Sequence, residues 1–372
     1  MIDIPQLPQI RVSFVIADLE GGGTQRVVSV MANAWVHAGR DVTVITFSTP
    51  ETDFFVLNSM VRRISLNGQR RSPSVFSALF ANFVRLLRLR RAIRDNGAPV
   101  VVGFIGQTNV LLILAALGLD MRVVVCERND LFRQSIGVPW DWCRRRFYPV
   151  ADVVTTNSRE VLNRMRAFID PHKLAYLPNP LIVPPGNERD ETVSSAVLAV
   201  GRLAWQKAYD VLIQAFALLQ PEHPEWCLVI LGEGEERQRL EDLMLNLNVD
   251  ESVELRGRIA DPFPIYRSAQ IFVMPSRHEG MPNALIEAMS CGIAPIVSDA
   301  TAGALEYVVH DVSGLVVPVD DAPALAAAIQ RLIVDIPLRC RLGSEARKRV
   351  QGLSVEDVTP EWDRILGLSS GC

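Results

Sequence analysis

Hydrophobic residues fall into short apolar runs that alternate with longer segments in which they recur every three to four positions. The short runs are typical of buried parallel strands, and the periodic segments are typical of helices that cover a sheet. We therefore expect a doubly wound α/β unit in the first half. Its predicted strands are Arg11–Ala17, Asp41–Phe47, Val100–Phe104, Arg122–Cys126 and Asp152–Thr156, and its predicted helices are Thr24–His37 and Ser74–Arg94.

The same alternation starts again after a proline-rich and then polar segment, from Leu177 to Thr192, that is typical of a linker. A second doubly wound unit is therefore expected, followed by one more helix at Val355–Leu366. The predicted strands of this unit are Ala196–Gly201, Cys227–Gly232, Val253–Gly257, Gln270–Pro275 and Ala294–Ser298, and its predicted helices are Asp210–Leu219, Glu235–Leu247 and Asn283–Met289.

Composition excludes several classes of protein. The chain has 372 residues, of which 49% are hydrophobic and 22% are charged, so it is too apolar to be disordered. Its longest apolar run, Val110–Leu119, is half the length that a membrane-spanning helix needs, and the N-terminus does not resemble a signal peptide. The six cysteines form no C-x-x-C pair. We expect a cytoplasmic protein with reduced thiols.

Charge is distributed unevenly between the two halves. Residues 1–180 carry 22 Lys and Arg against 14 Asp and Glu, whereas residues 181–372 carry 16 against 28. In the predicted helix Ser74–Arg94, three arginines flank an apolar stripe; the arginines are Arg85, Arg88 and Arg91, and the stripe is Phe76, Leu79, Phe80, Phe83, Leu86 and Leu87. This pattern indicates either a basic amphipathic helix that docks on an anionic membrane or a core helix with a solvated cationic edge.

Three segments could carry chemistry, and the first is Gly21-Gly22-Gly23. These glycines lie between a predicted strand and a predicted helix. Backbone amides at such a helix N-terminus favour a phosphate or a carboxylate. A tight strand-to-helix corner without a ligand is the alternative.

The second segment is Gly201-Arg202-Leu203 with Lys207, which leaves the first strand of the second unit. Ligands bind at the carboxyl ends of the strands in open α/β sheets. A guanidinium and an ammonium there could stabilise a diphosphate as it departs from a sugar. The alternative is a solvated loop with two ordinary cations.

The third segment runs from Ser276 to Met289. Glu279 follows a strand, Gly280 permits close approach of the backbone, and Glu287 lies about 6 Å along the helix from Asn283. Two carboxylates thus flank one helix N-terminus, where they could accept hydrogen bonds from sugar hydroxyls on either side of a phosphate. In the alternative, Glu287 is a helix-surface residue and Glu279 is a loop charge.

Together these residues resemble glycosyltransferase family 4, whose members are retaining enzymes with the GT-B fold. The resemblance extends over nearly the whole chain and is densest between Gly201 and Pro318. Besides the second and third segments, it rests on Gly232-Glu233-Gly234, Gly257-Arg258, Cys291–Pro295, Ser298-Asp299 and Asp311–Gly314.

The resemblance implies a function for each domain. Residues 1–180 would form a Rossmann-like acceptor-binding domain, residues 181–354 a Rossmann-like nucleotide-sugar domain facing it across a cleft, and residues 355–372 a helix that returns to the first domain and places Trp362 there.

It also implies roles for single residues. Arg202 and Lys207 would hold the donor diphosphate, Glu279 would contact the transferred sugar, and Glu287 would bind the ribose. These implied catalytic groups are Arg202, Lys207 and Glu279, and the implied donor-binding residues are Gly22, Gly23, Gly201, Arg258, Gly280, Met281, Asn283, Ala284, Leu285 and Glu287.

The chain departs from the family in the first domain, where Glu127-Arg128-Asn129-Asp130 replaces a histidine that many members have. This puts a histidine-centred mechanism in doubt. No Asp-x-Asp occurs, so we expect no metal and no cofactor, and the cations and a helix dipole would neutralise the diphosphate.

The sequence thus predicts a retaining, metal-independent glycosyltransferase. It would transfer a hexose or N-acetylhexosamine from a nucleotide-diphosphate sugar, most plausibly UDP-linked, to a polysaccharide or polyprenyl-diphosphate-linked acceptor in cell-surface glycan synthesis. We expect peripheral contact with the inner face of the plasma membrane and no nucleic acid. The alternatives are a nucleotide-sugar epimerase of the same fold and a non-catalytic protein that binds anionic ligands or nucleic acid.

Overall fold

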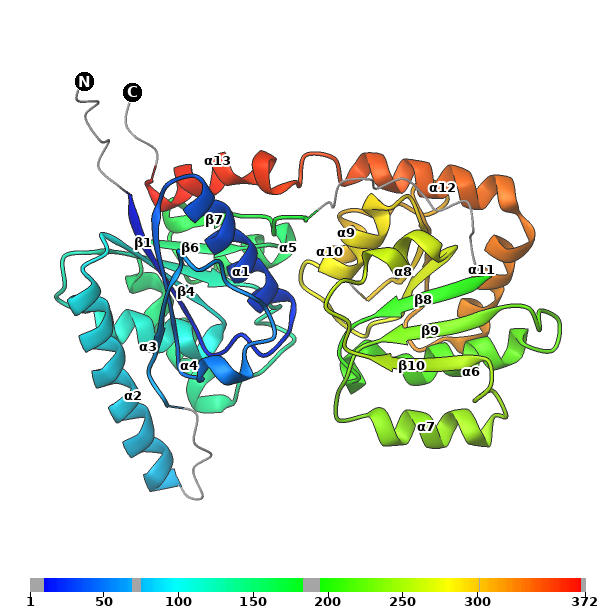
Figure 1. The fold of residues 1–372 in the computed structure, drawn as a ribbon, viewed down its shortest axis with the longest axis horizontal. Coiled ribbons are helices and arrows are strands. Elements are labelled where there is room, and N and C mark those ends of the chain that lie inside the picture. Colours follow the sequence, from blue (N-terminus) through cyan, green and yellow to red (C-terminus); the bar gives the residue numbers. More distant parts are fainter. Residues whose placement is uncertain (1–9, 69–74, 183–194, 301, 369–372) are drawn as a thin grey trace. The chain divides into compact units, whose positions relative to one another are not determined.

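The computed structural model describes residues 10–68, 75–182, 195–300 and 302–368, which fall into two compact units (Figure 1). Residues 1–180 with 355–372 form the first unit, and residues 181–354 form the second. Each unit is a parallel sheet covered by helices on both faces, so the predicted α/β, doubly wound architecture is confirmed. Most of the predicted linker, residues 183–192, lies outside the described residues.

The sheet of the first unit has the order β3-β2-β1-β4-β5-β6-β7, and its strands are parallel. The inner strands follow the valine-rich runs of the sequence, whereas β3 and β7 are short edge strands that the apolar pattern does not predict. The strands are β1 Arg11–Ile16, β2 Asp41–Thr46, β3 Arg62–Ser65, β4 Val100–Phe104, β5 Arg122–Glu127, β6 Val153–Thr156 and β7 Leu174–Tyr176.

Helices cover both faces of this sheet. The α2, α3, α4 and α5 helices pack on one face, while α1 and α13 pack on the other. The α3 helix is apolar around most of its circumference and almost wholly buried, so it has no amphipathic period that could predict it. The helices are α1 Gly23–His37, α2 Val75–Asn96, α3 Gly106–Ala116, α4 Val138–Phe147, α5 Arg159–Met165 and α13 Val355–Leu366, with 3₁₀ turns at Pro50–Thr52, Tyr148–Val150 and Pro171–Lys173.

The α13 helix follows the second unit in the chain but packs on the first. Its Trp362 is fully buried, and the indole Nε1 donates a hydrogen bond to the Pro178 carbonyl at 3.1 Å. The Trp362 ring also lies 6.1 Å from that of Trp35 and 6.4 Å from that of Phe104. An ion pair between Arg40 and Asp363 adds a polar contact. Aromatic burial therefore holds this helix on the sheet of the first unit.

The α2 helix buries only one edge of its apolar stripe, where Leu86 packs against the core. Leu89 and Ile93 face the core, whereas four residues of the stripe point to solvent: Leu79, Phe80, Phe83 and Leu87 are 64%, 70%, 56% and 50% exposed. Two of the flanking arginines also have internal partners. Arg85 donates to the Gly68 carbonyl at 2.8 Å, and Arg88 donates to the carbonyls of Leu66 and Asn67 at 3.0 and 3.1 Å. Both arginines thus use part of their hydrogen-bonding capacity within the domain. The side chain of Phe76 lies outside the described residues.

The sheet of the second unit has the order β10-β9-β8-β11-β12-β13, again with parallel strands. One apolar cluster lies beneath α6 and α11 and another beneath α8 and α9, on opposite faces. The strands are β8 Ala196–Val200, β9 Cys227–Leu231, β10 Val253–Gly257, β11 Ile271–Met274, β12 Ala294–Ser298 and β13 Leu315–Val317. The helices are α6 Tyr209–Leu219, α7 Arg237–Asn246, α8 Phe263–Ser268, α9 Asn283–Ser290, α10 Ala302–Leu305, α11 Ala322–Val334 and α12 Ile336–Arg349, with a 3₁₀ turn, η4, at Trp205–Lys207.

Side-chain caps fix where several helices begin. Asp321 accepts a hydrogen bond from the Ala324 amide at the start of α11, and Asp335 accepts one from the Leu338 amide at the start of α12, both at 2.9 Å. Each cap satisfies an amide that has no partner within its helix.

Among the described residues, no helix is both long and apolar enough to cross a bilayer.

The strand order of the second unit determines where its ligand site can form. The chain reverses direction across the sheet between β8 and β11, which are hydrogen-bonded neighbours. Loops that leave the carboxyl ends of two such strands diverge and form a crevice. The loop after β8 carries Arg202 and Lys207, and the loop after β11 carries Glu279. The fold therefore brings two motifs together that are far apart in the sequence.

Candidate functional site

A direct ion pair joins the two loops at the carboxyl ends of β8 and β11. The Lys207 Nζ lies 2.6 Å from the Glu279 Oε1, and the two side chains are 20% and 11% exposed. Partial burial strengthens such a charge-assisted hydrogen bond relative to one in water. The two residues are 72 positions apart in the chain. The pair holds the ammonium in place while leaving it within reach of a ligand.

Main-chain and arginine contacts hold the same two loops together. The Arg277 amide donates to the Gln206 carbonyl, and the Gln206 side chain donates to the His278 carbonyl, both at 2.8 Å. The Arg277 guanidinium lies 4.7 Å over the Trp205 ring and forms an ion pair with Asp210 at 3.3 Å. The sequence analysis did not single out Arg277. Its position two residues before Glu279 was the available signal. These contacts preorganise the Lys207–Glu279 pair.

Gly201 leaves the space that Lys207 occupies. A Cβ atom at Gly201 would lie 2.8 Å from the Tyr209 hydroxyl and 2.9 Å from the Lys207 Cε. Burial, and secondarily the negative charge of Glu279, raises the pKa of Tyr209, so this phenol stays neutral. The neighbouring Ala208 has a φ of 52°, a left-handed conformation that costs a non-glycine residue roughly 1–2 kcal/mol.

Gly232 and Gly234 allow the next loop to pack against the site. A Cβ atom at Gly232 would lie 1.8 Å from the Gly201 carbonyl oxygen, and one at Gly234 would lie 2.1 Å from the Leu203 carbonyl oxygen. Neither position tolerates a side chain without displacement of the backbone. The two glycines support the loop that carries Arg202 and Lys207.

The α9 helix carries the second predicted carboxylate. Glu287 is almost wholly buried, and its Oε2 accepts a hydrogen bond from the Tyr266 hydroxyl at 3.1 Å. Glu287 is therefore not an ordinary helix-surface residue, which was the alternative interpretation of its motif.

The other predicted donor-binding residues, between Gly280 and Leu285, differ in which of their atoms could contact a ligand. Met281 and Leu285 have core side chains, so their main-chain atoms are the ones that could contact a ligand, and their role stays a prediction. Asn283 and Ala284 are half-buried at the start of α9, where backbone amides favour anions. The Gly280 carbonyl lies against Gly303, where a Cβ atom would come within 1.6 Å.

Two predicted arginines are exposed. Arg202 follows Gly201 directly, and in the part of the chain that the structure describes it has no ion pair, so its charge is available to an anion. Arg258 follows β10 and contributes to the lowered pKa of Glu233, for which the hydrogen bond from Arg237 is the main cause. The direct ion pair at these strand ends joins Lys207 and Glu279.

Gly22 and Gly23 belong to the first unit, where they begin α1. Both are exposed, and Gly22 has a φ of 144°, which favours glycine. No side chain caps this helix start. The feature agrees with the predicted anion-binding turn in its geometry, and its role stays a prediction.

The segment that replaces the family histidine is closed to ligands. The Glu127 carboxylate is fully buried and accepts a hydrogen bond from the Tyr148 hydroxyl at 2.8 Å, with the Arg144 guanidinium 3.6 Å away. Burial raises the pKa of Glu127. Arg128 donates to the Leu177 carbonyl at 2.6 Å and lies over the Trp362 ring. These residues support the domain rather than form a catalytic base.

Metal ligands do not gather in the described ranges, where no three His, Cys, Asp or Glu side chains form a group that could hold an ion. Metal independence itself stays a prediction.

Two family profiles match the chain, one on each side of the linker. A profile described as "Glycosyl transferase 4-like domain" matches residues 22–180, and one described as "Glycosyl transferases group 1" matches residues 188–349.

Full-length relatives and solved structures agree with the profiles. A Campylobacter jejuni protein, named as a GalNAc-alpha-(1->4)-GalNAc-alpha-(1->3)-diNAcBac-PP-undecaprenol alpha-1,4-N-acetyl-D-galactosaminyltransferase, is 26% identical over 96% of this chain and 98% of its own length. Sucrose-phosphate synthase from Thermosynechococcus elongatus superimposes with a TM-score of 0.83 at 20% identity, over 97% of this chain and 99% of that one. Anabaena HepE in complex with UDP-glucose superimposes with a TM-score of 0.81 at 16% identity, over 96% and 100%.

Proposed function

The chain belongs to glycosyltransferase family 4 and has the GT-B fold, and from this premise we propose that it transfers a hexose or N-acetylhexosamine from a UDP-sugar to a polyprenyl-diphosphate-linked or polysaccharide acceptor. The transfer retains the anomeric configuration and needs no metal ion. The Lys207–Glu279 pair beside the exposed Arg202 carries this proposal. Family membership favours transfer over the epimerase and the non-catalytic alternatives.

The chemistry places growing negative charge next to the two cations. As the bond between the anomeric carbon and the diphosphate oxygen breaks, Lys207 and Arg202 neutralise the departing diphosphate. The acceptor hydroxyl forms its bond to the same face of the sugar, and its proton passes to the departing diphosphate oxygen. Glu279 orients Lys207 and accepts hydrogen bonds from hydroxyls of the sugar. The Glu127 carboxylate is buried and accepts a hydrogen bond from the Tyr148 hydroxyl. In this mechanism it therefore does not take the proton of the acceptor hydroxyl.

Relatives support the choice of donor and acceptor. The related Campylobacter jejuni enzyme is named for an undecaprenyl-diphosphate-linked saccharide, and HepE has been solved with UDP-glucose. In this chain, the buried Glu287 would accept hydrogen bonds from the ribose, and the start of α9 would face the diphosphate.

A screen for donor hydrolysis tests this function. We expect the purified protein to hydrolyse a UDP-sugar slowly, to release UDP faster when a lipid-linked saccharide accepts the sugar, and to change its rate less than about threefold when EDTA is added. Strict dependence on magnesium would contradict the metal-free mechanism. No turnover of any nucleotide sugar, with folded protein, would contradict the assigned activity.

The exposed face of α2 is suited to the surface where a lipid-linked acceptor resides. Its Leu79, Phe80, Phe83 and Leu87 form an outward apolar stripe. Arg88 donates to two neutral carbonyls, so its positive charge remains and would attract anionic headgroups. We therefore propose that α2 lies on the cytoplasmic leaflet as an interfacial helix.

Vesicle sedimentation tests the docking of α2. Replacement of Phe80 and Phe83 by aspartate is expected to lower binding to phosphatidylglycerol vesicles at least about tenfold, because each exposed phenylalanine would lose its burial in lipid. Donor hydrolysis should persist, since neither residue lies in the core. Leu218→Asp on α6, which is similarly exposed, is the matched control and should bind like wild type. Equal binding to zwitterionic vesicles would contradict the proposal.

A further inference from the structure

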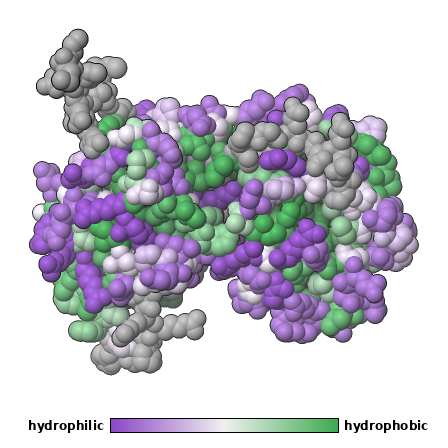
Figure 2. Space-filling model, in the orientation of Figure 1, coloured by the Kyte–Doolittle hydropathy of each residue, from purple (hydrophilic) through white to green (hydrophobic). Residues whose placement is uncertain are grey.

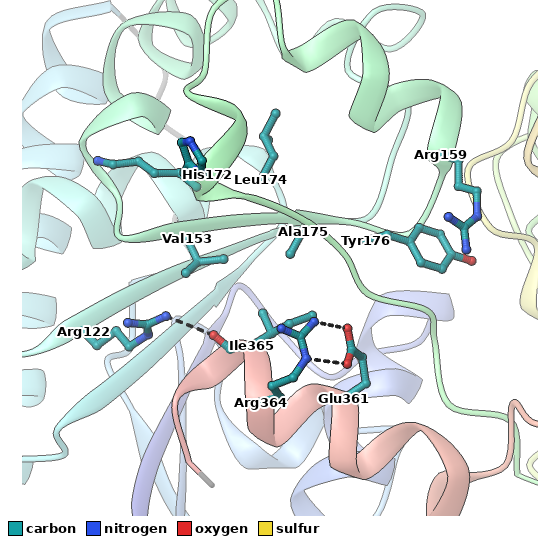
Figure 3. Close-up of a pocket in the computed structure, with 11 residues that line it drawn as sticks. Arg122, Val153, Arg159, His172, Leu174, Ala175, Tyr176, Glu361, Arg364 and Ile365 are labelled. Atoms are coloured by element: carbon teal, nitrogen blue, oxygen red, sulfur yellow. Dashed lines mark hydrogen bonds and ion pairs between the residues drawn. The ribbon is translucent and has the colours of Figure 1, made fainter. Parts of the chain in front are cut away.

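A polar groove lies in the first unit between the edge of its sheet and α13 (Figure 3). Its volume is about 490 Å³, within the range of sites that hold small organic molecules. The groove belongs to none of the segments that the proposed transfer uses. It is lined by Arg122, Val153, Arg159, His172, Lys173, Leu174, Ala175, Tyr176, Glu361, Arg364 and Ile365.

Positive charge dominates the lining. Four of the residues are arginines or lysines, and Glu361 is the only carboxylate among them. Arg122 begins β5, Arg159 begins α5, Lys173 ends a 3₁₀ turn and Arg364 lies on α13. No run of basic residues in the sequence contains more than one of them, so the fold alone gathers this charge.

Among the described residues, two of the cations are held by neutral acceptors and form no ion pair. The Lys173 Nζ donates to the carbonyls of Pro149 and Ala151 at 2.8 and 3.0 Å, so two of its three N–H groups are used. The Arg122 Nη2 donates to the Ile365 carbonyl at 3.2 Å. Both cations are thus oriented by the backbone and retain N–H groups for a ligand. Preorganised donors of this kind cost a ligand little ordering entropy.

Of the remaining two cations, Arg159 lies beside Tyr176 and Arg364 lies on α13. The Arg159 guanidinium lies 4.4 Å over the Tyr176 ring. Arg364 binds the Glu361 carboxylate through Nε and Nη2, at 2.8 and 2.5 Å, and this bond lowers the pKa of Glu361. The Nη1 group of Arg364 stays available. Glu361 therefore acts as an internal counter-ion that neutralises part of the positive charge of the groove.

The groove lies mainly toward the amino ends of the strands. Arg122, Val153 and Leu174 are the first residues of β5, β6 and β7. The groove also extends to the carboxyl end of this edge, because Tyr176 is the last residue of β7 and Arg159 begins α5 after β6. None of the segments assigned to the transfer lines the groove, so we assign it a binding function.

We propose that this groove binds an acidic saccharide, in which a carboxylate or phosphate group on a sugar pairs with Arg122, Lys173 and Arg364. The oxyanion would replace part of the contact that Arg364 makes with Glu361. A volume of about 490 Å³ equals roughly sixteen water molecules at about 30 Å³ each, which exceeds what a lone oxyanion fills. Its polar walls and the Tyr176 ring suit sugar hydroxyls and ring faces. The saccharide class rests on the proposed function, because a glycan is the material that such an enzyme handles.

Two single substitutions of opposite sign test the groove. Arg364→Gln should weaken binding of a galacturonic acid trisaccharide about tenfold, because a charge-assisted hydrogen bond is lost. Glu361→Gln should strengthen binding about threefold or more, because the internal counter-ion is removed. Arg364 is 68% exposed, so neither substitution is expected to unfold the protein. Arg145→Gln, an exposed arginine on α4, is the matched control.

Calorimetry on the full chain, in the absence of a nucleotide sugar, measures how tightly each saccharide binds. The acidic trisaccharide should bind, the neutral trisaccharide maltotriose should not, and binding should weaken at high salt. If inorganic phosphate binds as tightly as the trisaccharide, the saccharide assignment is overturned. If no probe binds, or if Glu361→Gln and Arg364→Gln shift affinity in the same direction, the groove proposal fails. Donor hydrolysis, measured in the same samples, reports separately on the proposed activity.

Discussion

Replacement of both Arg202 and Lys207 by alanine is expected to reduce sugar transfer at least about 100-fold, because removal of one preorganised stabiliser of developing charge already costs about that much. Lys207 contributes an ammonium that Glu279 fixes at 2.6 Å, and Arg202 contributes an exposed guanidinium on the same loop. Steady-state kinetics with the intact donor measures the loss. The expected change is mainly in kcat, since charge develops chiefly in the transition state.

Folding has to be separated from catalysis in this variant. Loss of Lys207 leaves the half-buried Glu279 carboxylate without its cation, which costs stability and also repels a diphosphate. A third substitution, Glu279→Gln, removes that repulsion, and Glu279→Gln alone is measured beside it because Glu279 itself contacts the sugar. Transfer that is much lower in the triple variant than in Glu279→Gln assigns the difference to the missing cations. Arg256→Ala, which removes an exposed arginine paired with Glu254, is the control. Activity of the double variant within threefold of wild type would contradict the assigned roles.

Loss of Glu287 is expected to weaken binding of free UDP about tenfold or more, whereas loss of Glu279 should spare that binding and lower turnover. Glu287 lies on α9 and would accept hydrogen bonds from the ribose, which free UDP contains. Glu279 would contact the transferred sugar, which free UDP lacks. Calorimetry with UDP alone separates the two variants Glu287→Ala and Glu279→Ala.

Tyr266→Phe supplies a control for indirect effects at Glu287. It removes the hydroxyl that donates to the Glu287 Oε2 at 3.1 Å but leaves the carboxylate in place. UDP affinity should stay within about threefold if the carboxylate itself binds the ribose. Equal losses of UDP affinity in the Glu279→Ala and Glu287→Ala variants would contradict the separate roles.

The inner strands of both sheets are predictable because burial on both faces demands continuous apolar runs. Val100–Phe104 and Ala294–Ser298 have the predicted bounds. The β3 strand, Arg62–Ser65, is not predictable in this way, because an edge strand needs only one partner and tolerates arginine. The α3 helix escapes prediction for the opposite reason, since a helix buried on almost every side has no polar face.

Local sequence patterns also predict the candidate site only in part. The sequence singled out Lys207, Glu279 and Glu287, since cations and carboxylates next to strand ends and a helix start suggest a diphosphate site. It could not pair Lys207 with Glu279, because their distance depends on β8 and β11 being neighbours in the sheet. Nor could it show that Met281 and Leu285 point into the core, since a short helix with apolar residues on several sides does not reveal which side is buried.

The sequence by itself determined the α/β class, the repeated architecture and the family, because these depend on residue types at local spacings. Only the tertiary structure decided which side of α2 faces solvent and where the isolated cations Arg122, Lys173 and Arg364 meet. The physical reason is that periodicity describes one element at a time. Contacts between elements depend on strand order and helix packing, which bring together residues that no local pattern connects.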